Sequence, residues 1–141
     1  MILDTNVLVY AVGSEHPLRG PARRLIAAVR DGQARATTSV LVLRELTYGY
    51  ARRRGDADAA ALARSYVELL EPLLPVEQVH FMTALRLVEE HHLRASDALL
   101  AATAIHASHP LVTADRAFAD ISGLQTVLLG EYAVERLLGK T

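Results

Sequence analysis

One stretch near position 100 limits the possible folds of this chain more than any other. Its residues are apolar or small on nearly all sides of a helix: Ala98-Leu99-Leu100-Ala101-Ala102-Thr103-Ala104-Ile105. Ser96 and Asp97 precede this stretch, and Ser96 is a residue type that favours a helix N-cap. A helix without a polar face has to be buried, so we expect it at the centre of the fold. The 141 residues are about the length of one domain, and we expect residues 1–141 to form a single one.

Short apolar segments alternate with longer amphipathic segments along the rest of the chain. We expect strands at residues 1–3, 34–38, 111–113 and 126–129. We expect the other helices at residues 7–12, 21–30, 40–54, 56–70, 77–91 and 131–138. In the helix 77–91, the apolar spacing predicts that Phe81, Leu85 and Val88 are buried. Strands that alternate with helices predict an α/β fold, with a parallel sheet covered by helices on both faces.

The composition excludes several kinds of site and partner. The chain has no cysteine, which rules out disulfides, thiolate nucleophiles and Cys-ligated metals and fits a cytoplasmic protein. Its net charge of -1 gives no broad positive field that would hold a long nucleic-acid duplex. Nothing in the sequence resembles a signal peptide or a membrane span, so we expect no membrane contact. The first 60 residues carry nine basic and six acidic side chains, so nucleic-acid contacts are expected to be local.

Four carboxylates stand where a parallel sheet places its functional residues. Asp4 follows the first strand, Glu45 lies within a helix, Asp97 opens the apolar helix, and Asp115 follows a late strand. Each alone has an ordinary interpretation as a helix cap, a turn residue or a solvated charge. In open α/β sheets, however, side chains from separate segments converge beyond the carboxyl ends of the strands. We therefore expect the four carboxylates to share one site.

Such a cluster of carboxylates needs a positive partner. At a separation of about 6 Å, each pair repels by roughly 2–3 kcal/mol at an effective dielectric of about 20. The site must therefore take up protons or a cation. A ligand set made only of oxygens suits Mg²⁺ or Mn²⁺, which leave coordination positions for water and phosphate oxygens. The chemistry that follows is metal-assisted hydrolysis of a phosphodiester.

Four strings carry these carboxylates: Ile2-Leu3-Asp4-Thr5-Asn6, Leu43-Arg44-Glu45-Leu46, Ser96-Asp97-Ala98-Leu99-Leu100-Ala101 and Leu111-Val112-Thr113-Ala114-Asp115-Arg116-Ala117-Phe118. Their order and spacing resemble the PIN-domain ribonucleases, and most of all the VapC toxins of VapBC toxin–antitoxin modules. The resemblance implies a three-layer α/β/α sandwich with a short, mostly parallel central sheet. It also implies an endoribonuclease that depends on Mg²⁺, with Mn²⁺ as a substitute. The partners it implies are RNA, a second copy in a homodimer, and a small antitoxin in a heterotetramer or larger complex.

The resemblance also assigns roles by position. Asp4 and Asp97 match metal ligands, and Asp115 and Glu45 complete the acidic pocket directly or through water. The family further implies that an antitoxin arginine blocks the pocket near Asp4, Asp97 and Asp115. Apolar antitoxin residues are then expected to pack against the helices on either side of Glu45.

Other polar residues receive lesser roles. Asn6 and Thr113 match positions that support and orient the carboxylates. Asp120 lies outside the matched strings, which favours a surface position over a fifth site carboxylate. The run Arg52–Arg54 could follow an RNA backbone, face an acidic partner or end a solvated helix, and the sequence leaves this open.

Several alternative functions fit the sequence less well than a toxin nuclease does. Two histidine pairs, His91-His92 and His106 with His109, fall at expected helix C-termini, where the helix dipole favours them, so a zinc site is the weaker interpretation. A phosphatase of the haloacid dehalogenase type needs a second aspartate where Asn6 stands. A PIN nuclease of RNA processing shares the four strings, although the short chain favours a stand-alone toxin. A non-catalytic PIN-like binding module is expected to lack an acidic residue, and all four are present.

Overall fold

A parallel sheet of three short strands lies at the centre of the computed structural model, which describes residues 1–139. The strands are β1 (Ile2–Leu3), β2 (Leu111–Thr113) and β3 (Thr126–Leu128), in the order β1-β2-β3. Leu3 pairs with Val112, and Thr113 pairs with Leu128. All residues of β1 and β2 are buried. This burial is the reason that these strands are continuous apolar runs without the alternation of a half-exposed strand.

The prediction of a strand at residues 34–38 is wrong. Only Thr37 pairs with the sheet: its N–H donates to the Met1 carbonyl at 2.9 Å, and its carbonyl accepts from the Leu3 N–H at 3.0 Å. The Thr38 hydroxyl bonds to the Leu3 carbonyl at 2.7 Å, and so a side chain takes the place of the next backbone pairing. The chain then leaves the sheet, because Ser39 caps the helix that follows. Pairing therefore stops at a single bridge.

Seven α-helices and one 3₁₀ turn surround the sheet within residues 1–139. They are α1 (Thr5–Val12), α2 (Arg19–Arg30), α3 (Val40–Arg54), α4 (Asp56–Leu70), α5 (Gln78–His91), α6 (Ala95–Ala107), η1 (Arg116–Phe118) and α7 (Glu131–Leu137). The predicted helices are confirmed, with ends that shift by a few residues. No helix in this part of the chain is long and apolar enough to cross a membrane.

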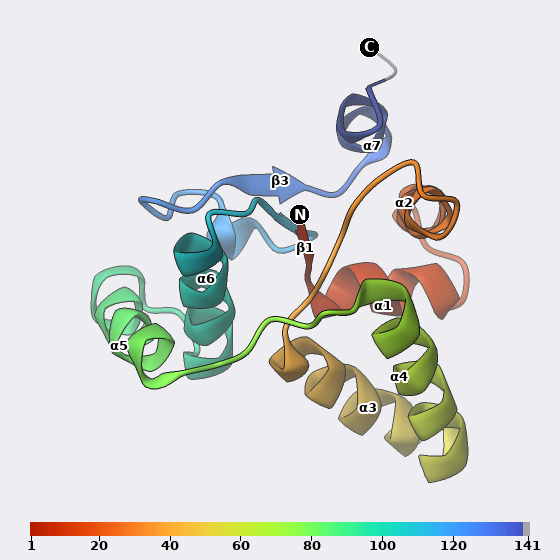
Figure 1. The fold of residues 1–141 in the computed structure, drawn as a ribbon, viewed down its shortest axis with the longest axis horizontal. Helices are drawn as coiled ribbons and strands as arrows, with labels where there is room; N and C mark the ends of the chain where they lie inside the picture. Colours follow the sequence, from red (N-terminus) through yellow and green to blue (C-terminus); the bar gives the residue numbers. More distant parts are fainter. Residues whose placement is uncertain (140–141) are drawn as a thin grey trace.

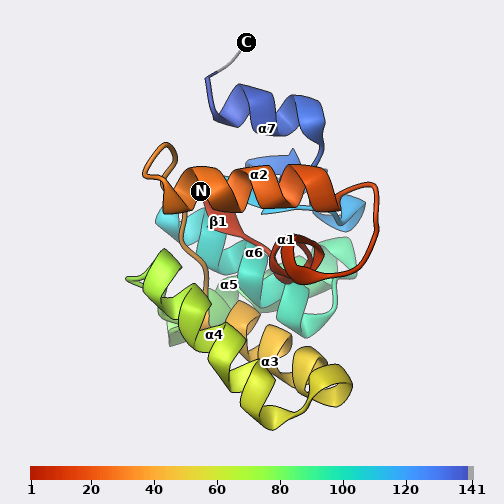
Figure 2. The same ribbon diagram turned by 90° about the vertical axis from the view of Figure 1, so that its right-hand side faces the viewer.

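Helices on both sides of the sheet give three layers (Figure 1), which confirms the predicted α/β/α sandwich. On one side α6 lies next to the sheet and α5 packs outside it, and on the other side lie α1 and α2. The hairpin of α3 and α4 extends at one end of the molecule, while α7 packs on α2 at the opposite end (Figure 2). Because α3 contacts both α1 and α6, the segments that carry Asp4, Glu45 and Asp97 meet.

The apolar helix α6 is buried, as its sequence predicts. The residues of this helix without any exposed surface are Ala98, Ala101 and Ala102. Its start differs from the prediction, because the N-cap is Arg94, whose side chain makes no capping hydrogen bond. Ser96 is not the cap, since it lies inside the first turn and is exposed. Asp97 also lies in this first turn, where the free N–H groups and the helix dipole favour a negative charge.

The prediction of which face of α5 is buried is wrong. Phe81 is 50% exposed and Leu85 is 43% exposed, while Ala84 and Leu87 are buried. Val88 is half-buried. Two apolar stripes on this helix both fit helical spacing, so spacing alone does not choose between them. The packing partner does: α5 lies on the alanine-rich α6, and a small residue such as Ala84 suits that interface better than an aromatic ring.

Candidate functional site

Asp4 joins the sheet to the first helix. It follows β1 and is the N-cap of α1, where its Oδ1 accepts a hydrogen bond from the Thr5 N–H at 2.7 Å. The residue is only 6% exposed. Burial raises the pKa of Asp4 above its ordinary value, and the nearby charges of Asp97 and Glu45 raise it further. Hydrogen bonds from Thr113 and Thr5 oppose this rise in the pKa.

Both residues predicted to support the carboxylates contact Asp4. Thr113 Oγ1 donates to Asp4 Oδ2 at 2.6 Å, and Asn6 Nδ2 donates to the same oxygen at 3.2 Å. Asn6 Nδ2 also lies 3.3 Å from Thr113 Oγ1, and Asn6 Oδ1 accepts from the Ala114 N–H at 3.0 Å. Thr113 Oγ1 in turn accepts from the Asp115 N–H at 3.0 Å. These bonds fix the Asp4 carboxylate against the segment that carries Asp115.

The other three carboxylates reach the same place from three further elements. Glu45 projects from α3 and accepts a hydrogen bond from Thr5 Oγ1 at 2.8 Å. Asp97 is half-buried at the start of α6. Asp115 caps η1 by accepting from the Ala117 N–H at 2.9 Å.

Together the four carboxylates line one hollow of about 240 Å³, which we call the acidic hollow. Its lining is Asp4, Thr5, Asn6, Val9, Tyr10, Glu45, Arg94, Asp97 and Asp115. Asp120 is exposed and does not belong to this lining. The structure thus brings together the four carboxylates that the sequence predicts for the site and leaves the fifth on the surface.

Four residues that line the acidic hollow were not predicted from the sequence, and two of them, Arg94 and Thr5, bond to its carboxylates. Arg94 Nε lies 3.2 Å from Asp97 Oδ2, and the Arg94 side chain is 78% exposed while that of Asp97 is 17% exposed. The hydrogen bond to Asp97 and the surrounding negative charges raise the pKa of Arg94. The signal for this contact was the i, i+3 spacing of Arg94 and Asp97 at a helix start. Thr5, which holds Glu45, gave no signal beyond its place in the first matched string.

The histidines lie apart from the acidic hollow. His91 ends α5 and His92 is its C-cap, which places this pair at a helix terminus. His106 lies in the last turn of α6, where its Nε2 is 2.8 Å from Thr83 Oγ1. Across residues 1–139, no three His, Asp or Glu side chains approach closely enough, as they stand, to hold one metal ion.

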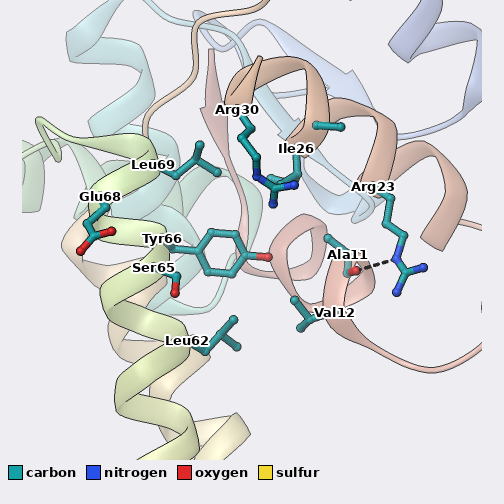
Figure 3. Close-up of a pocket in the computed structure, with 11 residues that line it drawn as sticks. Ala11, Val12, Arg23, Ile26, Arg30, Leu62, Ser65, Tyr66, Glu68 and Leu69 are labelled. Atoms are coloured by element: carbon teal, nitrogen blue, oxygen red, sulfur yellow. Dashed lines mark hydrogen bonds between the residues drawn. The ribbon is translucent and has the colours of Figure 1, made fainter. Parts of the chain in front are cut away.

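A larger cleft, of about 740 Å³, lies between α1, α2 and α4 (Figure 3). Apolar side chains such as Ile26 and Leu62 line it, together with the exposed residues Arg23 and Arg30. Tyr66 points across the cleft toward α1, and its hydroxyl donates to the Leu8 carbonyl at 3.0 Å. Burial raises the pKa of Tyr66 to about 12. None of the four carboxylates lines this cleft, and its mixture of apolar and charged side chains suits a different kind of ligand.

Comparison with known proteins identifies the family to which this fold belongs. The family model described as PIN domain matches residues 1–124. The chain belongs to the PIN domain family. Ribonuclease VapC7 of Mycobacterium tuberculosis is 43% identical over 142 residues, which cover 99% of this chain and 98% of that protein. Ribonuclease VapC13 of the same species is 30% identical over 128 residues, covering 89% of this chain and 97% of its own length. The predicted resemblance to VapC proteins is therefore confirmed.

Solved structures show the same PIN fold. VapBC2 from Rickettsia felis, bound to a DNA fragment from its promoter, aligns with a TM-score of 0.69 at 22% identity and covers 89% of this chain and 95% of that one. DNA-bound VapBC from Salmonella typhimurium aligns with a TM-score of 0.70 at 19% identity, with coverage of 89% and 94%. At these identities the likeness concerns the fold alone.

Proposed function

We propose that this PIN domain is a ribonuclease that acts as the toxin of a toxin–antitoxin pair. The observation that carries the proposal is the convergence of Asp4, Glu45, Asp97 and Asp115, from four separate segments, on one hollow. The full-length similarity to proteins named ribonuclease VapC supports the activity. Two structural neighbours support the biological setting: one is described as a toxin–antitoxin complex from Klebsiella pneumoniae, and the other as a member of the VapBC family of toxin–antitoxin systems from Mycobacterium tuberculosis.

We further propose that Asp4 and Asp97 hold a divalent cation, with Glu45 and Asp115 completing the site. Only oxygen donors face the hollow from these four residues, and such a donor set fits Mg²⁺, with Mn²⁺ as its substitute. When bound, such an ion acts as a Lewis acid that activates water and stabilises charge on a phosphodiester. Asp4 suits this role because Thr113 and Asn6 hold its Oδ2 in place, as outer hydrogen bonds commonly do for metal-binding carboxylates.

The remaining residues of the hollow have supporting roles in this proposal. Thr5 holds Glu45 from the first turn of α1 and so ties α3 to the hollow. Arg94 supplies one positive charge among the carboxylates, next to Asp97. That charge partly balances their mutual repulsion. The whole of residues 1–141 is proposed to work as one nuclease unit.

Cleavage of a panel of RNAs by the purified protein tests the proposed activity. We expect cleavage with Mg²⁺ or Mn²⁺ and none with EDTA. Asp4→Asn and Asp97→Asn should abolish cleavage while circular dichroism shows an unchanged fold, because each substitution removes one charge from a cluster that repels itself. Asp120→Asn is the matched control and should cleave as the wild type does. A wild-type protein that leaves every RNA intact with both ions would contradict the proposal and favour a binding module.

The proposed antitoxin would need a surface as well as the acidic hollow. The cleft between α1, α2 and α4 offers apolar side chains next to two arginines and one glutamate, Arg23, Arg30 and Glu68, so its net positive charge suits an amphipathic helix whose charged residues are mainly acidic. We propose that the antitoxin binds in this cleft, and not against the helices beside Glu45.

Growth experiments test this proposal. Expression of the protein alone should arrest growth, and co-expression of a small protein encoded beside it should relieve the arrest. Leu62→Asp should abolish that relief without affecting cleavage. The homodimer stays a prediction.

A further inference from the structure

A second hollow, of about 380 Å³, adjoins the acidic hollow along α1. Its lining is Val9, Val12, Gly13, Ser14, Arg19, Tyr50, Arg53 and Arg54. We call it the basic hollow, because no acidic residue belongs to this lining. Val9 lines both hollows, so they are neighbours on the same surface. The rise of an α-helix is about 1.5 Å per residue, so the first residues of α1 and its C-cap, Gly13, lie roughly 10 Å apart along the helix axis.

The three arginines of the basic hollow come from two helices. Arg19 is the first residue of α2, while Arg53 and Arg54 are the last two residues of α3. Neither Arg53 nor Arg54 takes part in an ion pair with the residues that the structure describes. Arg19 pairs through one nitrogen with Glu15, whose side chain is 98% exposed. An exposed pair of this kind contributes little, so the hollow keeps most of its positive character.

Arg19 also has a hydrogen-bond donor that lacks an acceptor. Its Nε is buried and has no hydrogen-bond partner among the residues that the structure describes. A buried donor without an acceptor is costly, and a rotation of the Arg19 side chain into the hollow would let a phosphate oxygen accept from this nitrogen. Arginine is well suited to this contact because its planar guanidinium matches the geometry of phosphate oxygens.

The helix dipole alone does not explain this arrangement. Cations at the C-terminus of α3 are favoured by the dipole, and that would account for any residue of the run Arg52–Arg54. Arg52, however, is occupied elsewhere: its guanidinium lies 5.7 Å from the ring centroid of Tyr48 and donates to the Tyr48 hydroxyl at 3.3 Å. The two residues that follow it line the basic hollow, where Arg19 joins them from a different helix.

We propose that the basic hollow binds the backbone of the RNA strand whose neighbouring phosphate is cut in the acidic hollow, an inference that rests on the proposed ribonuclease function. Four carboxylates repel a polyanion, so a substrate that reaches them needs cations close by. Arg19, Arg53 and Arg54 supply those cations next to the site, and Tyr50 offers an aromatic ring on which a base can stack. The position beside the carboxylates favours RNA over an acidic protein as the occupant.

RNA binding by full-length variants tests this inference. Affinity for a labelled single-stranded oligoribonucleotide is measured by fluorescence anisotropy in the Asp4→Asn background, over a series of salt concentrations. The variants are Arg19→Gln and the double substitution Arg53→Gln with Arg54→Gln. We expect several-fold weaker binding, and a slope of log Kd against log salt that decreases by about 0.7 for each phosphate that the variant no longer neutralises. Arg52→Gln is the matched control, because it removes the same charge from the same helix end outside the hollow, and its affinity should match the parent.

Cleavage kinetics with an otherwise wild-type chain give the second measurement. Substitutions in the basic hollow should raise KM and leave kcat nearly unchanged, because these residues position the RNA without touching the cleaved bond. An equal weakening of RNA affinity by Arg52→Gln and by the hollow variants would overturn the inference in favour of general charge. Unchanged RNA affinity, with or without weaker antitoxin binding, would overturn it as well. These results differ from a failure of the proposed function, in which the wild type cuts no RNA.

Discussion

Thr113 Oγ1 donates a 2.6 Å hydrogen bond to Oδ2 of Asp4, although the two residues stand 109 positions apart in the sequence. The bond joins the end of β2 to the end of β1, and those strands are neighbours in the sheet. Thr113 Oγ1 also accepts from the Asp115 N–H. One hydroxyl therefore aligns two of the four carboxylate-bearing segments.

Thr113→Val should reduce cleavage by about 10- to 100-fold, the usual cost of removing a hydrogen bond behind a metal-binding carboxylate. The substitution keeps the shape of the side chain and removes the donor that opposes the raised pKa of Asp4. Thr113→Ser should restore most of the activity, because serine retains the hydroxyl. Thr103→Val is the control: Thr103 is also buried, but its hydroxyl bonds within α6 to the Leu99 carbonyl. Equal reductions for the two valine variants would point to packing as the cause.

Asp4 should make the stability of the metal-free protein depend on pH. Its folded-state pKa is raised above the ordinary value of 3.8, so the folded state holds this proton more tightly than the unfolded state. The resulting stability is fully present below pH 3.8 and is lost as the pH rises through the folded pKa. Urea unfolding in EDTA should therefore show the wild type losing stability relative to Asp4→Asn as the pH rises. If the difference in unfolding free energy between the wild type and Asp4→Asn stayed constant as the pH rose above 3.8, that result would contradict the raised pKa of Asp4.

Arg94→Gln should lower the melting temperature in EDTA and lower it less in Mg²⁺. Without an ion, Arg94 is the positive side chain that lines the acidic hollow. A divalent cation would take over this balancing role, so the substitution matters less once the cation is bound. The effect should be small and largest at low salt, because the guanidinium is exposed. Arg116→Gln, an exposed residue beside Asp115 but outside the hollow, is the control. The same decrease with and without Mg²⁺ would count against this role.

Tyr66→Phe should lower the free energy of unfolding by about 1 kcal/mol, because it removes one buried hydrogen bond. Its hydroxyl donates to the Leu8 carbonyl at 3.0 Å and so ties α4 to α1. The pKa of Tyr66 is raised from 10.0 to about 12, so the stability due to this group is lost as the pH rises through that range. The wild type should therefore approach the variant in urea unfolding at alkaline pH. Tyr132→Phe, at a residue that is 67% exposed, should change little.

Three features were not predicted from the sequence patterns, because each depends on how a segment packs or on where a helix begins. Phe81 and Leu85 form a stripe as regular as the buried stripe of α5, and only contact with α6 decides which faces inward. The segment 34–38 has strand-like residues, yet Thr38 and Ser39 bond in ways that end its pairing after one bridge. The contact of Arg94 with Asp97 needs the helix to begin at Ala95, two residues before the start that an N-cap at Ser96 predicts.

The α/β class, the buried apolar helix and the four candidate carboxylates could be predicted from the amino-acid sequence alone, whereas the supporting positions of Asn6 and Thr113 came from the resemblance to PIN-domain ribonucleases. The fold class, the buried helix and the carboxylates depend on local composition and on the order of segments along the chain, which the sequence shows directly. Tertiary packing is what places Arg94 among the carboxylates and brings Arg19 together with Arg53 and Arg54 in one hollow. Helices pack by the shapes and areas of their surfaces, and no local pattern records which charged side chains that packing brings together.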